Sequence, residues 1–478
     1  MRGHFPDVDG RADYCVYWFR KAHDELKPNQ RAGLVGTNTI RQNYSRTGGL
    51  DYIVKNGGTI TEAVSTMKWS GEAVVFVSIV NWIKGEQFGK KRLYIQEGND
   101  PSKGWSYTDL ETIGPALSFV KDVTQARTIR ANAVNGGCYQ GQTHGHEGFL
   151  LNIAEADSAI KLNHRNEEVL FPYLIANELV GSKDSLPTRY VIDFYPRDLL
   201  EARTYTPLFD RVQDIVLPDR KKAAAQEEKR NEEALADDPD GSVNRHHENF
   251  LRRWWQLSYP RGDMLDAIGG LRRYVACGRV TARPIFEFVS SAIRPNDALM
   301  VFPYDDDYSF GILQSGIHWI WSINRCSTLK GDPRYTSNTV FDSFPWPQNP
   351  SRQAVQEVAA AAVDLRTLRR KLKQQYDMSF RELYRTLELP GVSPLKDAHS
   401  VLDLAVREAY GMSNSVDPLA FLLQLNQSVA NREDAEETVL GPGLPRVLKD
   451  KSSLVTEDCI HMAAKAAKHD VVAGADKA

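Results

Sequence analysis

The sequence lacks the features of a metal-bound, disulfide-linked or membrane-spanning protein. None of its cysteines forms a Cys-x-x-Cys pair, which argues against a zinc site and fits a reducing cytoplasm. No apolar run approaches the roughly 20 residues that a membrane-spanning helix needs, and the start of the chain, with Arg2, His4 and Asp7, is no signal peptide. We therefore expect a cytoplasmic protein without a metal or membrane contact. The cysteines are Cys15, Cys138, Cys277, Cys326 and Cys459.

An excess of basic charge, the usual mark of nucleic-acid binding, is also absent. The 478 residues include 59 Lys and Arg against 62 Asp and Glu, a formal net charge of −3. Any surface that binds nucleic acid must therefore be local. Hydrophobic residues make up 42% and charged residues 25%, an ordinary globular composition for a chain of about two to four domains.

A helix followed by strands is predicted near the N-terminus. Val16, Phe19 and Leu26 recur at helical spacing before a proline. A short strand follows at Leu34, and residues 73–80 form an apolar, β-branched run that suits a strand buried on both faces. This order indicates an open α/β sheet, which binds ligands at the carboxyl ends of its strands.

The rest of the chain mixes strands and helices and then becomes helical. Residues 218–240 predict a solvated helix with ion pairs of mixed sign, ended by a turn. Residues 351–427 predict amphipathic helices, with a capping box at Ser379 and Glu382. The tail after about Arg432 is expected to be largely disordered. Further segments predict strands at Tyr190–Tyr195, Arg273–Val280, Ile285–Val289 and Leu299–Pro303, and helices at Leu208–Val216 and Gly311–Ile323.

Three polar or aromatic residues of the first region are candidate site residues, each with a structural alternative. Asp13 opens the predicted helix, where a carboxylate can also act as a simple cap. Asn38 lies in Thr-Asn-Thr at a strand's end and can donate to and accept from a base edge, although the same tripeptide can be a turn. Trp69 precedes the buried strand, where a tryptophan is commonly part of the core.

Arginines interleave with aromatic residues between residues 250 and 288. Concentrated arginine can bind phosphates and fork onto guanine edges even in an acidic chain. The alternative is that Trp254, Trp255, Tyr259 and Tyr274 are core residues and the arginines a solvated rim. The arginines are Arg252, Arg253, Arg261, Arg272, Arg273, Arg279 and Arg283.

Two stretches that could suggest a metal do not predict a site. The residues of Asp305–Asp307 are consecutive and share no face, and no further ligand is evident. The stretch 144–147 (His-Gly-His-Glu) contains a glycine that favours a flexible loop, and no third ligand is apparent.

Longer patterns give the chain a family resemblance. One pattern is the order ADYCVYWF…LKP…GLVGTN…W…EAVVFVSIV. It resembles the second half of an N6-adenine DNA methyltransferase domain. Two further stretches are RRWWQLSYPR and RYTSNTVFDSFPWP. They resemble the target-recognition domain of MmeI-like (type IIG/IIL) restriction–modification enzymes. The resemblance covers about residues 8–427.

The resemblance implies an α/β fold in four parts. Residues 1–95 would be the C-terminal half of a Rossmann-like methyltransferase sheet, and 96–347 a mixed α/β DNA target-recognition domain. Residues 348–430 would be a helical C-terminal spacer, and 431–478 the disordered tail.

The resemblance also implies residue roles. Asp13 and Tyr14 would line the pocket for S-adenosylmethionine, Asn38 the target-base pocket, and Trp69 would stack on an adenine flipped out of the duplex. Neither the catalytic Asn-Pro-Pro-aromatic motif nor the Gly-rich cofactor turn occurs in the sequence, so no catalytic residue is assigned. The residues expected to contact DNA are Arg41, Arg252, Arg253, Arg272, Arg273, Arg279, Arg283 and Arg334.

The expected function is part of a site-specific DNA methyltransferase that acts on adenine N6 in a restriction–modification system. This chain would bind double-stranded DNA, stack on the target base and recognise the sequence. It would have no catalytic activity alone, because the catalytic motif is expected upstream of Met1, in the missing N-terminal half. Three alternatives stay open: a specificity subunit with a separate catalytic chain, a fusion to an upstream nuclease, and an α/β interaction protein that does not bind DNA.

Overall fold

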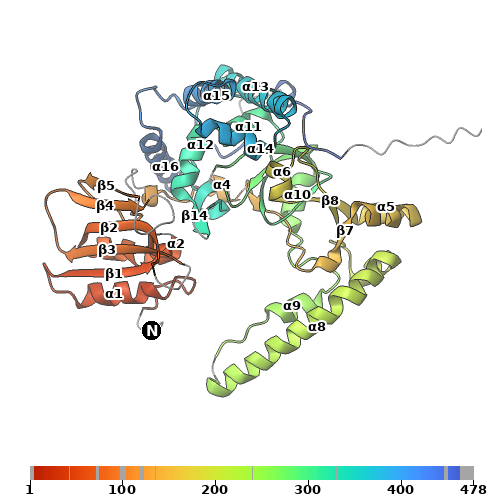
Figure 1. Cartoon of the computed structure of the whole chain (residues 1–478), viewed down its shortest axis with the longest axis horizontal. Helices are drawn as coiled ribbons and strands as arrows, with labels where there is room; N and C mark the ends of the chain where they lie inside the picture. Colours follow the sequence, from red (N-terminus) through yellow and green to blue (C-terminus); the bar gives the residue numbers. More distant parts are fainter. Residues whose placement is uncertain are drawn as a thin grey trace, which may run out of the picture.

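The protein is described from a computed structural model of the chain. The structure describes residues 5–41, 43–70, 75–96, 104–117, 123–134, 136–239, 241–281, 283–329, 332–445 and 451–462. Figure 1 shows a sheet-containing N-terminal part, a central part with a projecting helical arm, and a group of helices towards the C-terminus. Among the described residues, no helix is both long and apolar enough to cross a membrane.

The N-terminal part is built on a five-stranded sheet with the order β1-β3-β2-β4-β5. Because β3 is antiparallel to both neighbours, β1 and β2 run parallel to each other. The predicted helix and strands are confirmed, although residues 73 and 74 of the predicted second strand lie outside the described residues. The elements are α1 (Cys15–Glu25), β1 (Arg31–Thr37), α2 (Asn43–Gly48), α3 (Leu50–Lys55), β2 (Gly58–Lys68), β3 (Phe76–Lys84), β4 (Lys91–Gln96) and β5 (Trp105–Leu110).

One hydrophobic core joins α1 to this sheet. Phe19 of α1 stacks on Trp82 of β3, with 5.7 Å between the ring centroids. Ile113 and Leu117 belong to the same core, and β5 pairs with β4, so the N-terminal part continues past the predicted boundary at residue 95. The sequence did not indicate β5, because this strand is exposed and mostly polar.

The central part contains two four-stranded sheets, β11-β10-β13-β6 and β12-β8-β9-β7, and a β14-β15 hairpin. The strands predicted in this region are confirmed to within a few residues. The elements are α4 (Arg130–Val134), β6 (Tyr139–Gln140), β7 (Leu150–Asn152), α5 (Ile153–Leu162), β8 (Leu170–Leu174), α6 (Ala176–Gly181), β9 (Arg189–Ile192), α7 (Leu199–Arg203), α10 (Gly262–Gly269), β10 (Arg273–Gly278), β11 (Glu287–Ser290), β12 (Arg294–Pro295), β13 (Leu299–Phe302), β14 (Ser327–Leu329) and β15 (Asp332–Arg334).

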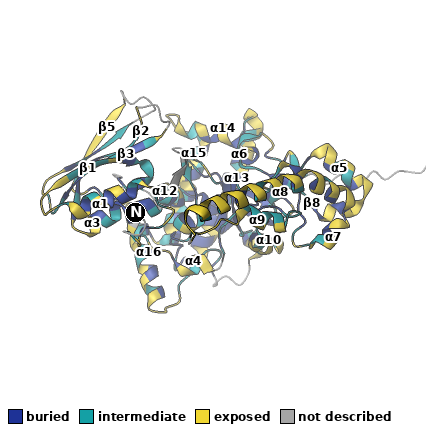
Figure 2. Ribbon diagram, turned by 90° about the horizontal axis from the view of Figure 1, so that it is seen from below, coloured by how far each residue is buried: buried dark blue, intermediate teal, exposed yellow. Residues whose placement is uncertain are grey.

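The arm is formed by α8 (Thr206–Asp237) and α9 (His246–Arg252). The predicted solvated helix is confirmed, since the outer half of α8 is mostly exposed (Figure 2) and carries mixed-sign pairs such as Lys229 with Glu233. Two buried charges hold α9 onto α8. Arg220 donates to backbone carbonyls at the end of α9, and Glu227 accepts two backbone N–H groups at its start.

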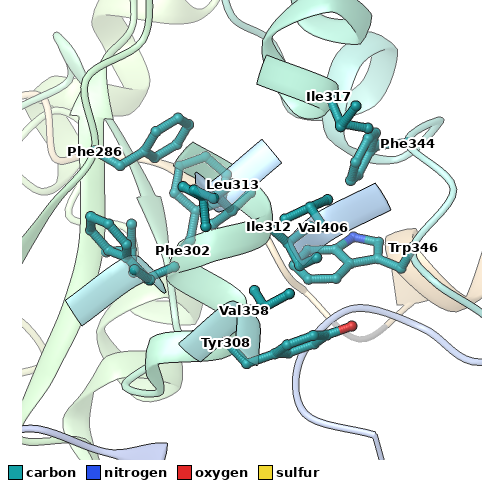
Figure 3. Packing of buried hydrophobic residues seen from close by; sticks show 14 of the residues in the cluster. Phe286, Phe302, Tyr308, Ile312, Leu313, Ile317, Phe344, Trp346, Val358 and Val406 are labelled. Atoms are coloured by element: carbon teal, nitrogen blue, oxygen red, sulfur yellow. The ribbon is translucent and has the colours of Figure 1, made fainter. Parts of the chain in front are cut away.

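The C-terminal helices share a core with the central sheet. Figure 3 shows Phe302 of β13, Leu313 of α11 and Val358 of α13 packed in one cluster. The predicted helical spacer therefore packs continuously against the central part of the chain. The helix predicted at 311–323 is divided, because Ser315 caps a new helix there. The helices are α11 (Asp307–Gln314), α12 (Gly316–Arg325), α13 (Arg352–Tyr376), α14 (Phe380–Arg385), α15 (Pro394–Tyr410) and α16 (Pro418–Asp434).

Residues 451–462 are bound to the rest of the chain, so the prediction of disorder is wrong for this segment. Ile460 forms a bridge with Val289 of β11. Asp458 accepts hydrogen bonds from Arg273 and Arg366, which are both buried. Because such charges are costly to bury unpaired, the segment is fixed by its carboxylate. Residues 463–478 lie outside the described residues.

This arrangement predicts that Asp458→Asn releases the segment. Burial alone would raise the pKa of Asp458, but hydrogen bonds and charge from Arg366 outweigh it and lower that pKa well below its usual range. The stabilisation is thus present above the ordinary carboxylate pKa of about 3.9 and is lost as the pH falls through the lower folded-state pKa. We expect Asp458→Asn at pH 7 to speed proteolytic cleavage within 451–462 by roughly 100-fold, about 3 kcal/mol.

Asp434→Asn is the matched control, because it removes an exposed pair with Arg127. Its effect should stay below about 1 kcal/mol. Equal cleavage rates in wild type and Asp458→Asn would contradict the assigned role of Asp458.

Candidate functional site

The carboxyl ends of β1 and β2 lie at the same border of the N-terminal sheet. Thr37 of β1 and Met67 of β2 both pair with Val77 of β3, from its two sides. Asn38 and Trp69 follow these strands, so the structure places both predicted site residues at one border. Trp69 is 39% exposed and donates its backbone N–H to the Val75 carbonyl. The core alternative for Trp69 is therefore not supported.

Asp13 organises this border from the start of α1. Its Oδ2 accepts hydrogen bonds from the hydroxyls of Thr37 (2.6 Å) and Thr39 (2.7 Å), and its backbone N–H donates to Ser45. Burial would raise the pKa of Asp13, but the two hydroxyl bonds outweigh it and lower the pKa, so the carboxylate is ionised. Asn38 lies between the two threonines, and its side-chain amide has no partner among the residues that the structure describes.

These residues fit one end of an adenosine-like group. Tyr14 is exposed beside Asp13 and can offer a ring face, and the Asn38 amide can donate and accept at a base edge. The oxygen Oδ2 of Asp13 is already occupied by the two threonines, so this carboxylate acts by fixing their loop.

Arg41 is bound inside the molecule. Its Nε donates to Thr66 at 3.0 Å, and burial lowers the pKa of Arg41 from its ordinary value. Arg41 was predicted to contact DNA. In the structure its side chain instead connects the loop after β1 to β2.

A second candidate site is a cluster of three arginines, Arg261, Arg279 and Arg334, in the central part. Arg279 follows β10 directly and Arg334 ends β15, and the two segments are joined because the Tyr335 N–H donates to the Arg279 carbonyl. The pKa of Arg279 is lowered to about 10, mainly by burial and also by the positive charges of Arg334 and Arg261, while the negative charge of Asp297 acts in the opposite direction. Like charges therefore converge here.

The guanidinium groups of Arg279 and Arg334 have no carboxylate or hydrogen-bond partner within the described part of the chain. Arg261 donates to Gln140 at 3.3 Å and lies over the ring of the exposed Tyr259. Three partly buried cations are thus opposed by one nearby carboxylate, Asp297, with which none of them forms a salt bridge, and a bound anion would neutralise the remaining positive charge.

The remaining predicted arginines each have a partner in the chain. Arg252 pairs with Glu248 and Arg272 with Glu457, both on the surface. Arg253 donates to the Ser258 carbonyl at 3.3 Å. Arg283 lies over the ring of Trp319, 4.6 Å from its centroid.

Arg273 does not lie on any surface, so the expectation that it contacts DNA is wrong. It is 2% exposed and donates to the Asp305 carbonyl and to the Asp307 carboxylate. Its guanidinium also lies over the Phe288 ring at 3.5 Å. The sequence could not separate Arg273 from Arg279, because both flank the same apolar strand.

The aromatic residues of the basic stretch divide between core and surface. Trp254 packs on Phe209 with 5.3 Å between the ring centroids. Tyr274 is buried, and its hydroxyl donates a hydrogen bond to the Ile293 carbonyl. Tyr259 is exposed beside the arginine cluster. No group of three or more potential metal ligands occurs among the described residues.

Comparisons with known proteins agree with this architecture. A family model described as "MmeI, target recognition domain" matches residues 272–348, which contain Arg279 and Arg334. The solved structure of the type IIL restriction–modification enzyme MmeI in complex with DNA matches with a TM-score of 0.67 and 18% identity, over 90% of this chain and 55% of MmeI. The chain matches part of an MmeI-like restriction–modification enzyme. The predicted resemblance and α/β fold class are thereby confirmed.

Two further proteins show smaller likenesses. DNA methyltransferase A of Bacillus subtilis (strain 168) is 31% identical over 133 residues, 27% of this chain and 14% of that protein. The type IIG restriction endonuclease BpuSI matches with a TM-score of 0.27 and 11% identity, over 84% of this chain and 50% of its own, which is too low to bear on the fold. The chain therefore spans about half the length of MmeI, and its match covers a small part of the methyltransferase.

Because the arginines of the cluster form no salt bridges with described residues, replacing one of them should not lower the stability of the fold. Arg279→Gln removes one of three converging positive charges, so the free energy of unfolding should stay unchanged or rise by up to about 1 kcal/mol. Arg272→Gln, which loses the exposed pair with Glu457, is the control and should be neutral or slightly destabilising. A loss of more than about 1 kcal/mol in Arg279→Gln, measured by thermal unfolding, would mean that the Arg279 guanidinium has a structural role.

Proposed function

We propose that this chain recognises double-stranded DNA in the cytoplasm and supplies the base-stacking and recognition portion of a site-specific adenine-N6 DNA methyltransferase. The unpaired cluster of Arg261, Arg279 and Arg334 is the observation that carries the proposal. Phosphates and guanine edges are the groups that such guanidiniums bind in a duplex. The match to a DNA-bound relative supports the same conclusion.

The border of the N-terminal sheet would meet the target base. A base inside a duplex is inaccessible to methyl transfer, so it must be flipped out and held by stacking. Trp69 would provide the stacking face and Asn38 the hydrogen bonds to the base edge. Tyr14 and the loop fixed by Asp13 would hold the adenosine end of S-adenosylmethionine, which would supply the methyl group.

The chain by itself contains no Asn-Pro-Pro-aromatic motif. We therefore propose that it does not transfer methyl groups alone and that a catalytic polypeptide completes it.

The second candidate is a specificity subunit that binds DNA without binding S-adenosylmethionine. The hydrogen bonds of Asp13 favour this candidate, since its carboxylate already accepts from the hydroxyls of Thr37 and Thr39. Titration of the chain with S-adenosylmethionine distinguishes the two candidates, because only the methyltransferase portion is expected to bind it.

The DNA proposal is tested with random-sequence duplex DNA at several salt concentrations. Each phosphate contact adds about one unit to the slope of log K against log salt. Arg279→Ala and Arg334→Ala should each weaken binding and lower the slope by about one unit, and the double variant by about two. Arg352→Ala, an exposed arginine at the start of α13, should leave the slope unchanged. Unchanged slopes in both cluster variants would reject the proposed surface.

The stacking proposal is tested with a duplex that contains one unpaired adenine. Wild type should prefer this duplex over the fully paired one, and Trp69→Ala should lose about 1–3 kcal/mol of that preference. Trp69→Phe retains an aromatic face and should keep most of it. If Trp69→Ala and Trp69→Phe lose equal amounts, or neither loses any, Trp69 does not stack on the base.

A further inference from the structure

The arginine cluster shares its surface with one carboxylate, that of Asp297. Arg279 donates its backbone N–H at 2.8 Å to the carbonyl of Ala298, the residue after Asp297. Arg261 donates to the side chain of Gln140, and the amide of Gln140 donates to the Asp297 carbonyl at 3.1 Å. Two of the three segments that carry the arginines are therefore attached to the backbone around Asp297.

The Asp297 side chain is fixed in orientation but is not neutralised. This residue is half-buried, and its Oδ2 accepts a hydrogen bond from the hydroxyl of Thr143 at 2.9 Å. The other oxygen, Oδ1, has no hydrogen-bond partner among the residues that the structure describes. A carboxylate that lies among cations without forming a salt bridge with them keeps an acceptor for a ligand.

A DNA phosphate alone does not account for a carboxylate at this place. Phosphate oxygens only accept hydrogen bonds, and their charge is repelled by a neighbouring carboxylate, so Asp297 weakens any contact between the arginines and the DNA backbone. The edge of a base pair contains both kinds of group. In the major groove guanine presents the acceptors O6 and N7, which arginine binds, and cytosine presents the N4 amino group, which a carboxylate binds. The mixed surface therefore matches a G·C pair.

We propose that Asp297 and the arginine cluster read one G·C pair in the major groove. Asp297 accepts from cytosine N4, and a guanidinium of the cluster donates to guanine O6 and N7. This inference rests on the proposed function, which brings duplex DNA to this surface, and it names the base pair and the residue that selects it. Selection is also by repulsion, because thymine O4 or guanine O6 at the cytosine position would face a carboxylate. Thr143 is a positioning residue that directs Oδ1.

This role gives Asp297 opposite effects on specific and on non-specific binding. On DNA of random sequence the arginines mostly meet phosphates, and the charge of Asp297 opposes that contact. On the correct base pair the same charge accepts a hydrogen bond. Asp297→Asn should therefore bind random-sequence duplex about twofold more tightly or better, and should lose roughly tenfold in discrimination at one position. A purely structural role would change both in the same direction.

The first experiment selects duplexes that bind the whole chain from a pool randomised at its central positions. Wild type should enrich a G·C pair at one position, and Asp297→Asn should lose this preference there while it retains the preferences elsewhere. Asp364→Asn removes the same charge from the exposed side of α13 and should change neither preference nor affinity. An unchanged preference in Asp297→Asn, or no enriched G·C pair in wild type, would overturn the proposal.

The second experiment tests the hydrogen bond to cytosine with one altered base. The selected duplex is prepared with pyrimidin-2-one, which lacks the N4 amino group, in place of that cytosine. Wild type should lose roughly tenfold in affinity, whereas Asp297→Asn should lose much less, although both proteins meet the same weakened base pair. Equal losses would overturn the proposal. Thr143→Val should lose part of the preference for cytosine, and Thr143→Ser, which retains the hydroxyl, should keep it.

Failure of this proposal is distinguishable from failure of the proposed DNA recognition. The salt dependence of Arg279→Ala on random-sequence DNA reports the arginine and does not require Asp297. A lowered salt slope in Arg279→Ala, together with an unchanged base preference in Asp297→Asn, would reject the reading of the G·C pair and leave the DNA-binding surface in place. An unchanged slope in the arginine variants would reject the surface itself.

Discussion

The buried ion network around Asp307 and Asp458 is the interaction on which the central and C-terminal parts depend. Asp307 at the start of α11 accepts from Arg273 of β10 and from Arg366 of α13, and Asp458 accepts from the same two arginines. Removal of one member would leave an unpaired charge in the interior. The network therefore fixes the recognition sheet, the helices and residues 451–462 as one unit.

The two ends of β10 have opposite roles because of this network. Arg273 begins the strand and is neutralised inside the protein, whereas Arg279 follows its last residue and forms no salt bridge with any described residue. The other five residues of β10, all buried, separate these environments. Anchoring of one end holds Arg279 and, through the backbone bond to Tyr335, Arg334 at a fixed separation. The surface proposed to read DNA is thus supported by a rigid strand, not by a loop alone.

Much of the fold could be predicted from periodicity, because α1, β3, β10 and the helices from α13 onward bury regular apolar faces. The features that were missed depend on tertiary contacts. β5 is polar and becomes a strand only by pairing with β4, and residues 451–462 are fixed by two tertiary contacts, the burial of Leu454 and the hydrogen bonds of the Asp458 carboxylate. For the candidate site, the sequence singled out Asn38 and Trp69, which the structure places at the same end of the N-terminal sheet, but it could not show that Asp13 binds two threonines. It also treated the basic stretch as one surface, although burial separates Arg273 from Arg279.

The most direct measurement is photo-crosslinking of the chain to duplex DNA from two exposed valines. A photoreactive phenylalanine analogue at Val280, next to Arg279, should crosslink to DNA, and the yield should fall as salt rises. The same analogue at Val401 on α15, which is also exposed, should give little crosslinking. Crosslinking from position 401 and not from position 280 would contradict the claim that the unpaired arginine cluster is the DNA-binding surface.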